Sequence, residues 1–414
     1  MQLKKAMIGG LVALTATSGL IATSISPAAA DPTRPYAAVG SDTIQDVWNG
    51  LTNDFGAVAP SIASWNAFPN PPATDLTTGN VYIQTKTNGN WFIRPSGSGE
   101  GVKALSATWN PTLHPGNPYP FSGSTSAALN HQDVDFARSS GGPASGTGLT
   151  YLPFARDAVT VAFKPTTGLT SLTLTEGQLH EIYTGIDDTT DSVVTFTGLS
   201  GGTTGTPLST SHVFVNGVEV HPKIPQSGSG TRKFFNAAIA GNNAIGGDAP
   251  YITDPGLPAV GGIPENDGSQ LVNAGDMVPF SAAQWIAQAN GKAPVDTTTG
   301  LALASIDLGV ANGGVQAPTT GTAPTLAPGG LFGGKNGVGD FNTVPSTTVV
   351  GTFNRDTFDV VPTLFLTGSA KQTALVSILA GLGGASAKAV IRSFGFGSLS
   401  YVGNTSNYLP GAWS

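Results

Sequence analysis

Gln226-Ser-Gly-Ser-Gly-Thr-Arg-Lys-Phe-Phe235 separates a strand-like run, residues 218–224, from a helix-like run, residues 231–240. A Gly- and Ser-rich turn that opens a helix leaves the first backbone N–H groups without intrahelical partners. The helix dipole adds partial positive charge at the same end. Ser229 and Thr231 add hydroxyl donors, and the glycines allow close approach of a ligand. The stretch therefore predicts a site for a phosphate, sulfate or carboxylate group, although such a turn alone is more often only a turn.

The composition is that of a secreted, loop-rich globular protein. The chain has 414 residues, enough for two or three domains, and only 10% of them are charged. The formal net charge is −7, so a nucleic-acid partner is not expected. An acidic protein that binds an anion must do so with local dipoles and a few Arg side chains. The sequence contains no cysteine, so disulfides are absent and no lipid can be attached through a thiol.

The first thirty residues have the pattern of a secretory signal peptide. Lys4 and Lys5 precede an apolar run over residues 7–21, and Ala28-Ala29-Ala30 stands before Asp31 as a cleavage site. A membrane anchor is the alternative, but Thr and Ser interrupt the run, and no other stretch is long and apolar enough to span a bilayer. We therefore expect residues 1–30 to be removed and the mature chain to be secreted.

Small polar loops recur where predicted strands end or predicted helices begin. Gly40-Ser-Asp-Thr43 follows a strand-like run and precedes a helix whose apolar residues recur at helical spacing. Ser96-Gly-Ser-Gly-Glu-Gly101 opens another helix, and Arg138-Ser-Ser-Gly-Gly142 follows a strand over residues 133–137. In α/β proteins ligands bind at the carboxyl ends of strands. Several such loops in one cleft would surround a small anion with N–H and O–H donors.

The remaining chain contains further strand and helix signals. A Thr175-Glu-Gly-Gln178 capping box begins a helix. Strands are expected over residues 151–154, 158–163, 349–353 and 358–366, and helices over 370–382 and 386–394. Residues 291–345 are rich in Gly, Thr and Pro, and are expected to form an insertion or long loop.

In motif order and content the chain resembles the phosphate-binding proteins of ABC uptake systems, a branch of the two-lobed periplasmic binding proteins. The resemblance covers about residues 36–289, and six motifs follow one another in the family's order. They are Gly40-Ser-Asp-Thr43, Ser96-Gly-Ser-Gly-Glu-Gly-Val-Lys103, Val134-Asp-Phe-Ala-Arg-Ser-Ser140, the helix of residues 174–185, Ser227-Gly-Ser-Gly-Thr231 and Glu265-Asn-Asp-Gly268.

The resemblance implies a set of ligand-binding residues for inorganic phosphate or a related oxyanion. These are Ser41, Asp42, Thr43, Ser98, Arg138, Ser139, Ser140, Ser229, Gly230 and Thr231. It also implies no enzymatic activity, no cofactor and no metal. A monomer that delivers its ligand to an ABC transporter permease is the expected context.

Two charged members of the family's site are missing from their usual places. The buried Asp that accepts a hydrogen bond from protonated phosphate falls on Ser140, and the family's Arg falls on Pro225. Asp42 is the candidate replacement for the acceptor and Arg138 for the cation, with Arg94 and Arg232 as further candidates. Taken alone, Asp42 is typical of a helix N-cap, and Arg138 of a surface ion pair.

Two other classes of function remain as alternatives. Gly198-Leu-Ser-Gly-Gly202 fits the G-x-S-x-G pattern by letters, but lacks the strand and helix that a nucleophile elbow needs. The five histidines show no metal-ligand spacing, so a phosphatase-like enzyme has little support. A secreted scaffold that keeps the fold for protein contacts is the stronger alternative.

The sequence thus predicts an α/β protein with the two-lobed periplasmic-binding-protein fold, in which helices flank mixed sheets. The expected divisions are a signal peptide (1–30), the first part of lobe one (31–154), lobe two (155–290), the Gly/Thr/Pro-rich insertion (291–348) and the completion of lobe one (349–414). A hinge is expected near residues 154–157.

Overall fold

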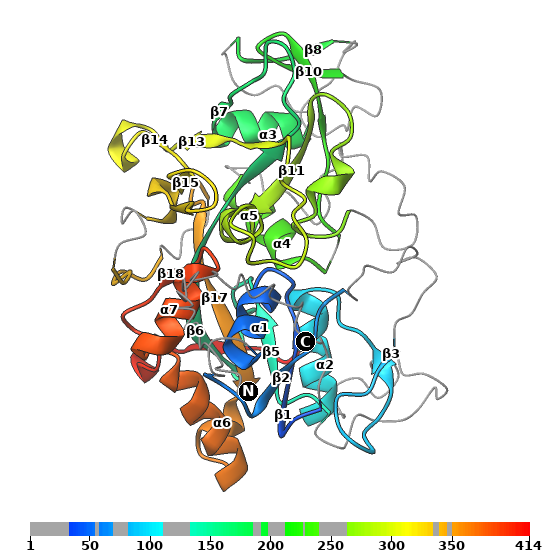
Figure 1. Ribbon diagram of the computed structural model, residues 1–414, viewed down its shortest axis with the longest axis vertical. Coiled ribbons are helices and arrows are strands. Elements are labelled where there is room, and N and C mark those ends of the chain that lie inside the picture. Colours follow the sequence, from blue (N-terminus) through cyan, green and yellow to red (C-terminus); the bar gives the residue numbers. More distant parts are fainter. Residues whose placement is uncertain are drawn as a thin grey trace, which may run out of the picture.

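Two lobes connected by long shared strands make up the protein (Figure 1). The computed structural model describes residues 33–53, 58–68, 82–110, 133–184, 192–197, 212–226, 228–239, 263–333, 339–345 and 350–414. The predicted signal peptide lies outside the described residues. The lower and upper lobes are named here as they stand in Figure 1.

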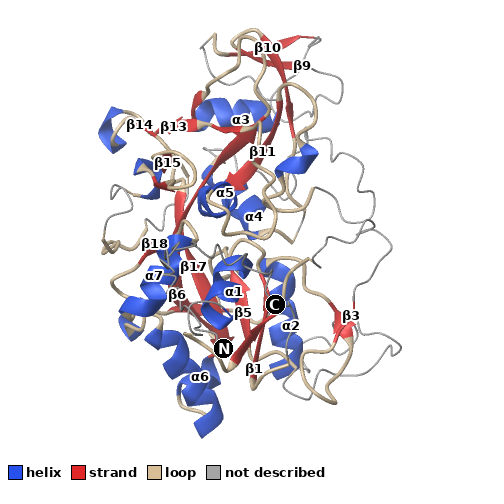
Figure 2. Cartoon of the chain, viewed as in Figure 1, coloured by secondary structure: helices blue, strands red, loops and turns tan. Residues whose placement is uncertain are grey.

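The lower lobe is a mixed sheet between helices, as the secondary-structure colouring shows (Figure 2). Strand β1 (Tyr36–Gly40) pairs in parallel with β2 (Ile62–Ser64) and with β5 (Phe136–Ser139). Strand β17 (Asn354–Pro362) runs antiparallel to β5. The helices are α1 (Gln45–Asn53), α2 (Ser98–Trp109), α6 (Ala370–Gly381) and α7 (Ala385–Ser393), and the short strands are β3 (Tyr82–Ile83), β4 (Phe92–Ile93), β18 (Gly397–Ser398) and β19 (Leu409–Gly411).

The upper lobe continues the sheet. Strand β11 (Asp276–Ser281) runs antiparallel to β6 (Leu149–Phe163), and β10 (Val218–Pro222) is parallel to β11. Strands β9 (His212–Val215) and β8 (Val194–Thr197) complete this edge. The helices are α3 (Glu176–Thr184), α4 (Gly230–Ala238) and α5 (Ala282–Ala289). The capping box of α3 forms as predicted, because Thr175 and Gln178 exchange hydrogen bonds of 3.0 and 3.1 Å.

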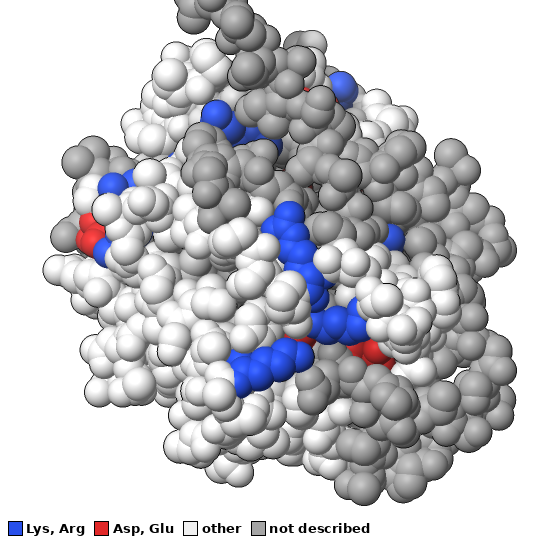
Figure 3. Space-filling view, turned by 60° about the horizontal axis from the view of Figure 1, so that its bottom comes forward, with Lys and Arg blue, Asp and Glu red and all other residues white. Residues whose placement is uncertain are grey.

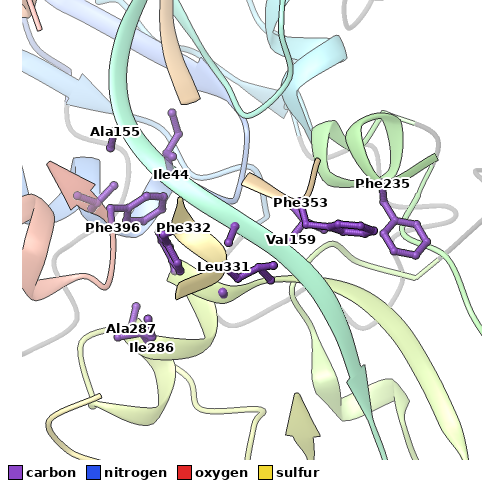
Figure 4. Close-up of a cluster of buried hydrophobic side chains, with 14 of the residues drawn as sticks. Ile44, Ala155, Val159, Phe235, Ile286, Ala287, Leu331, Phe332, Phe353 and Phe396 are labelled. Carbon is purple, nitrogen blue, oxygen red and sulfur yellow. The ribbon is translucent and has the colours of Figure 1, made fainter. Parts of the chain in front are cut away.

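Strand β6 belongs to both lobes. Residues 149–158 pair with β17, and residues 159–163 pair with β11, so the partner changes between Ala158 and Val159. Figure 4 shows Ala155 and Val159 among buried side chains such as Ile44, which precedes α1, and Phe235 of α4. Two separate strands were expected over this segment. The prediction was wrong because the intervening residues are fully buried and paired with β17.

The long loop expected over residues 291–345 is instead partly strand. It contains β12 (Ala302–Leu303), β13 (Ser305–Asp307), β14 (Val315–Gln316), β15 (Thr319–Thr320) and β16 (Ala327–Pro328). Strand β12 pairs with β6, and β13 pairs in parallel with β7 (Thr173–Thr175). The segment therefore packs on the upper lobe through backbone pairing, which Gly/Thr/Pro composition did not indicate.

Other boundaries differ from expectation where backbone pairing ends early. Strand β17 ends at Pro362 and continues as a 3-10 helix, Thr363–Leu366, instead of a strand to residue 366. Residues 350–353 form a turn and a short connection instead of a strand. The Glu265-Asn-Asp-Gly268 motif leads into a single 3-10 turn, Gly268–Gln270.

The described surface has few charges. On the face shown in Figure 3 most described side chains are uncharged, and a few Lys and Arg side chains gather near its middle. Within the described ranges no single helix is long and apolar enough to cross a membrane. Only α6 and α7 taken together meet the length and composition criteria, and they are bent by 65°.

Candidate functional site

Loops from both lobes meet at Ser98, Ser140 and Gly230. Ser98 is the first residue of α2, and its Oγ lies 3.1 Å from Ser140 Oγ and accepts a hydrogen bond of 2.9 Å from the backbone N–H of Ser140. Gly230 opens α4, and a Cβ at this position would lie 2.4 Å from Ser140 Oγ and 2.5 Å from Ser98 Oγ. The three predicted loops therefore touch one another, and a side chain at residue 230 would displace the hydroxyl groups of Ser98 and Ser140.

Direct hydrogen bonds join the same loops across the lobes. The backbone N–H of Gly99 donates to Gly228 O at 3.3 Å. The side-chain amide of Gln226 donates to Ser96 O at 2.9 Å. The lobes are therefore in contact at this point, and the hydroxyl groups here are buried.

Thr43 and Thr231 extend the cluster, and a carboxylate joins them. The Oγ1 atoms of the two threonines lie 3.4 Å apart. Glu265 Oε1 accepts from Thr43 Oγ1 at 2.7 Å and from the backbone N–H of Thr231 at 3.0 Å. The Glu265 carboxylate thus already accepts a hydrogen bond from one of the N–H groups that the start of α4 would otherwise offer to an anion. The sequence motif at residues 265–268 marked this segment, but it did not assign Glu265 to the site.

Arg355 of β17 is the cation that touches this cluster. Its Nη2 donates to Thr231 Oγ1 at 2.8 Å and to Asp157 Oδ2 at 2.9 Å, and its Nε donates to Asp157 at 3.1 Å. The side chain is buried, and Nη1 has no hydrogen-bond partner among the described residues. Sequence reasoning missed Arg355. The available signal was a cluster of charged residues in a strand of a chain with few charges.

Arg138 has a different position from the one expected for a ligand-binding cation. Its guanidinium donates to the carbonyl oxygens of Gly40, Ser41 and Trp65 and to Ser64 Oγ, at 2.7–3.2 Å. These contacts hold the loop after β1 in place. The other candidates, Arg94 and Arg232, donate to the carbonyl oxygens of Asn66 and Pro225.

Three of the predicted serines make contacts outside the hydroxyl cluster. Ser229 is the N-cap of α4, and its side chain accepts from the backbone N–H of Arg232 at 2.9 Å. Ser139 Oγ donates to Gly141 O at 2.8 Å. The backbone N–H of Ser41 donates to Arg138 O at 3.0 Å. These residues shape the loops, whereas Ser98, Ser140, Thr43 and Thr231 bring hydroxyl groups together.

Asp42 and Asp46 are buried carboxyl groups beside this cluster. Burial raises the pKa of Asp42 well above its usual range, and the neighbouring Glu265 carboxylate raises it further. Asp42 Oδ2 also accepts a hydrogen bond of 3.4 Å from the Asn266 amide. Burial raises the pKa of Asp46 to about 6. In the described ranges no group of three or more His, Asp or Glu side chains is arranged to hold a metal ion.

Comparisons with known proteins find likeness only at the level of structure. No protein-family model and no curated protein sequence matches the chain. Among solved structures, the chain is similar to an ABC-type phosphate transport receptor from Vibrio cholerae, with 12% identity, 87% of this chain and 99% of that chain covered, and a TM-score of 0.40. The chain is also similar to a human phosphate-binding apolipoprotein, with 16% identity, 89% of this chain and 92% of that chain covered, and a TM-score of 0.45. For a phosphate-binding protein from Stenotrophomonas maltophilia the identity is 14%, the coverage is 91% of this chain and 93% of that chain, and the TM-score is 0.42. Identities and TM-scores this low leave the function to be judged from the site's own residues.

Proposed function

We propose that this protein captures inorganic phosphate or a related oxyanion between its two lobes. The observation that carries the proposal is the convergence on Thr231 of donors from both lobes and of one buried cation. Thr43 comes from the lower lobe, Thr231 is the second residue of α4 in the upper lobe, and Arg355 Nη2 lies 2.8 Å from Thr231 Oγ1. Neutral O–H and N–H groups with one Arg are the donors that a small oxyanion requires.

The donors around Thr231 already have internal partners. Ser98 and Ser140 bond to each other, and Glu265 holds the N–H of Thr231. An arriving oxyanion therefore replaces these bonds, and contacts from both lobes favour the closed state over the open one. Binding of this kind forms no covalent bond. The proposed context is a secreted protein that serves ABC-type uptake or scavenging.

Substitution of Arg355 distinguishes oxyanion binding from a purely structural role of the cluster. Arg355→Lys keeps a positive charge next to Asp157 but removes the planar fork that reaches Thr231. We expect phosphate to raise the Tm of the wild-type protein, as a ligand that binds only the folded state must. We expect the shift to be much smaller in Arg355→Lys. Arg392→Lys on α7 is the matched control, because its guanidinium bonds Asp340 and Ser398 instead. Equal shifts in the wild-type protein and both variants would remove Arg355 from the site.

A protein scaffold without a small-molecule ligand is the second candidate. The same internal bonds favour it, because hydroxyls and a carboxylate that satisfy one another need no anion. In that case neither phosphate nor sulfate changes the Tm of the wild-type protein.

A further inference from the structure

A pocket lies beside the hydroxyl cluster formed by Thr43, Ser98, Ser140 and Thr231. It has a volume of about 250 Å³. Glu265 lines it and also accepts a hydrogen bond from Thr43 of the hydroxyl cluster, and Asp42, which precedes Thr43, lines it as well. The other lining residues come from α1, residues 264–269, α5, residues 293–297 and the end of the segment after β2.

The described walls of this pocket carry acidic but no basic side chains, and the nearby Arg138, which is outside the lining, lowers the pKa of Asp46 only in part. Among its described lining residues four are carboxylic acids and none is Lys, Arg or His; the acids are Asp42, Asp46, Glu265 and Asp267. The exposed fractions of Asp42 and Asp46 are 5% and 7%. Their Oδ1 atoms have no hydrogen-bond partner among the described residues. The raised pKa of Asp42 favours a protonated carboxyl group, which carries a donor of its own. A buried acceptor left without a donor destabilises the fold by about 1–3 kcal/mol, so Asp46 Oδ1 is the atom that indicates a missing donor.

The remaining walls define what that donor is. The side-chain amides of Gln45, Gln284 and Gln288 add polar groups, and Phe68 and Val295 supply apolar contact. The acidic side chains in the described ranges form no group of three or more that is arranged to hold a metal ion. A positively charged N–H donor attached to a few carbon atoms satisfies both the carboxylates and the apolar walls.

We infer that this pocket binds a small organic ammonium group, held by Asp42 and Asp46. The ammonium group belongs either to a separate amine or to the ligand whose oxyanion occupies the neighbouring cluster. An ammonium group that belongs to the oxyanion ligand rests on the proposed function, whereas binding of a separate amine in the pocket does not. An ammonium group here offsets the negative charge that Glu265 places beside the oxyanion site. Each ligand therefore raises the affinity of the other by the same factor.

Titration calorimetry of the mature protein with propylammonium chloride tests the pocket alone, with sodium chloride as the blank. We expect binding by the wild-type protein and at least a tenfold loss of affinity in Asp46→Asn, which keeps the side chain's shape. Asp307→Asn on β13 is the matched control and should bind as the wild type does, since Asp307 lies outside the pocket. The inference is overturned if propylammonium gives no heat of binding, or if Asp46→Asn binds it unchanged.

A pair of phosphonates distinguishes the two sources of the ammonium group. If 2-aminoethylphosphonate binds at least tenfold more tightly than ethylphosphonate, and Asp46→Asn removes that advantage, both groups belong to one ligand. If propylammonium instead strengthens the binding of ethylphosphonate, the amine is a separate ligand. If propylammonium binds while phosphate and both phosphonates do not, the proposed function fails and the ammonium site stands.

Discussion

The carboxylate of Glu265 accepts a hydrogen bond of 3.0 Å from the backbone N–H of Thr231, at the start of α4. A helix N-terminus is a place where proteins bind anions, and here a side chain of the chain itself supplies the negative charge. Arg355 contacts the same threonine through its hydroxyl group. An oxyanion that binds at Thr231 therefore competes with the Glu265 carboxylate for the backbone N–H, and it gains the positive charge of Arg355.

Glu265→Gln should strengthen oxyanion binding. The amide oxygen can still accept from Thr231, but the negative charge that repels the ligand is removed. Two unit charges about 4 Å apart repel by about 4 kcal/mol at an effective dielectric constant of 20, so an affinity gain of at least tenfold is expected. Titration calorimetry with phosphate measures it. Glu219→Gln, a loss of the same charge at a partly exposed position of β10, is the control. Weaker binding in Glu265→Gln would mean that the carboxylate accepts a proton from the ligand.

Ser229 allows the charge at the start of α4 to be changed without loss of its cap. Asp and Asn both serve as N-caps, so Ser229→Asp and Ser229→Asn should both retain the bond from Arg232. Only Ser229→Asp adds a negative charge at the proposed site, and it should bind phosphate at least tenfold more weakly than Ser229→Asn. Comparison of the two dissociation constants, with thermal unfolding to check the fold, measures this. Equal affinities would exclude the start of α4 from the oxyanion site.

Gly230→Ala should separate the loops of the two lobes. Its Cβ would lie 2.4 Å from Ser140 Oγ and 2.5 Å from Ser98 Oγ, closer than real Cβ atoms come. We expect at least a tenfold loss of phosphate affinity because the donors can no longer surround one anion. Gly142→Ala is the control, since nothing lies within 4 Å of its Cβ. A variant Gly230→Ala that binds as tightly as Gly142→Ala would show that loop contact at this point is not needed.

Asp46 should make the protein less stable as the pH rises. Burial raises its pKa from 3.8 to about 6, so the folded protein takes up a proton more readily than the unfolded chain. The contribution of Asp46 to the free energy of unfolding is fully present below pH 3.8 and is lost as the pH rises through about 6. Two pKa units correspond to about 3 kcal/mol. In ligand-free protein, Asp46→Asn should be more stable than the wild type at pH 8 by up to this amount, and the difference should shrink toward pH 4. Urea unfolding at both pH values checks it, and a difference that is independent of pH would contradict the shift.

Much of the local structure could be predicted from the sequence because its causes are local. The Gly/Ser turn before a helical pattern predicts a helix from residue 231, and α4 begins one residue earlier, at Gly230; Ser229, predicted as a ligand contact, is its N-cap. The capping box at Thr175 is likewise a contact over three residues. The hydroxyl loops at Ser98 and Ser140 were expected in one place from their resemblance to a known motif order, and they lie in contact.

The charged members of the site could not be predicted in the same way because their contacts span the chain. Arg355 and Asp157 are 198 residues apart, and Thr43 and Glu265 are 222 residues apart. Arg138 lies only two residues before Ser140, but its guanidinium is bound by carbonyl oxygens of residues 40, 41 and 65, which are distant in the sequence. Its guanidinium therefore supports the loop after β1 instead of reaching the hydroxyl cluster. The prediction of two strands in place of β6 has a related cause. Two charged residues in a row, Arg156 and Asp157, are typical of the end of a buried strand, but here each is paired with a charged residue of β17, Asp356 or Arg355.

Oxyanion capture is tested most directly by isothermal titration of the mature, phosphate-stripped protein with phosphate, with sulfate as the second titrant. The proposed site predicts saturable binding of an oxyanion with one site per chain, and weaker binding in Ser229→Asp. Binding of sulfate without phosphate would show that the site takes a fully ionised anion and that no carboxylate accepts a proton from it. Absence of heat with both anions would contradict oxyanion capture and leave the scaffold as the function of the two lobes.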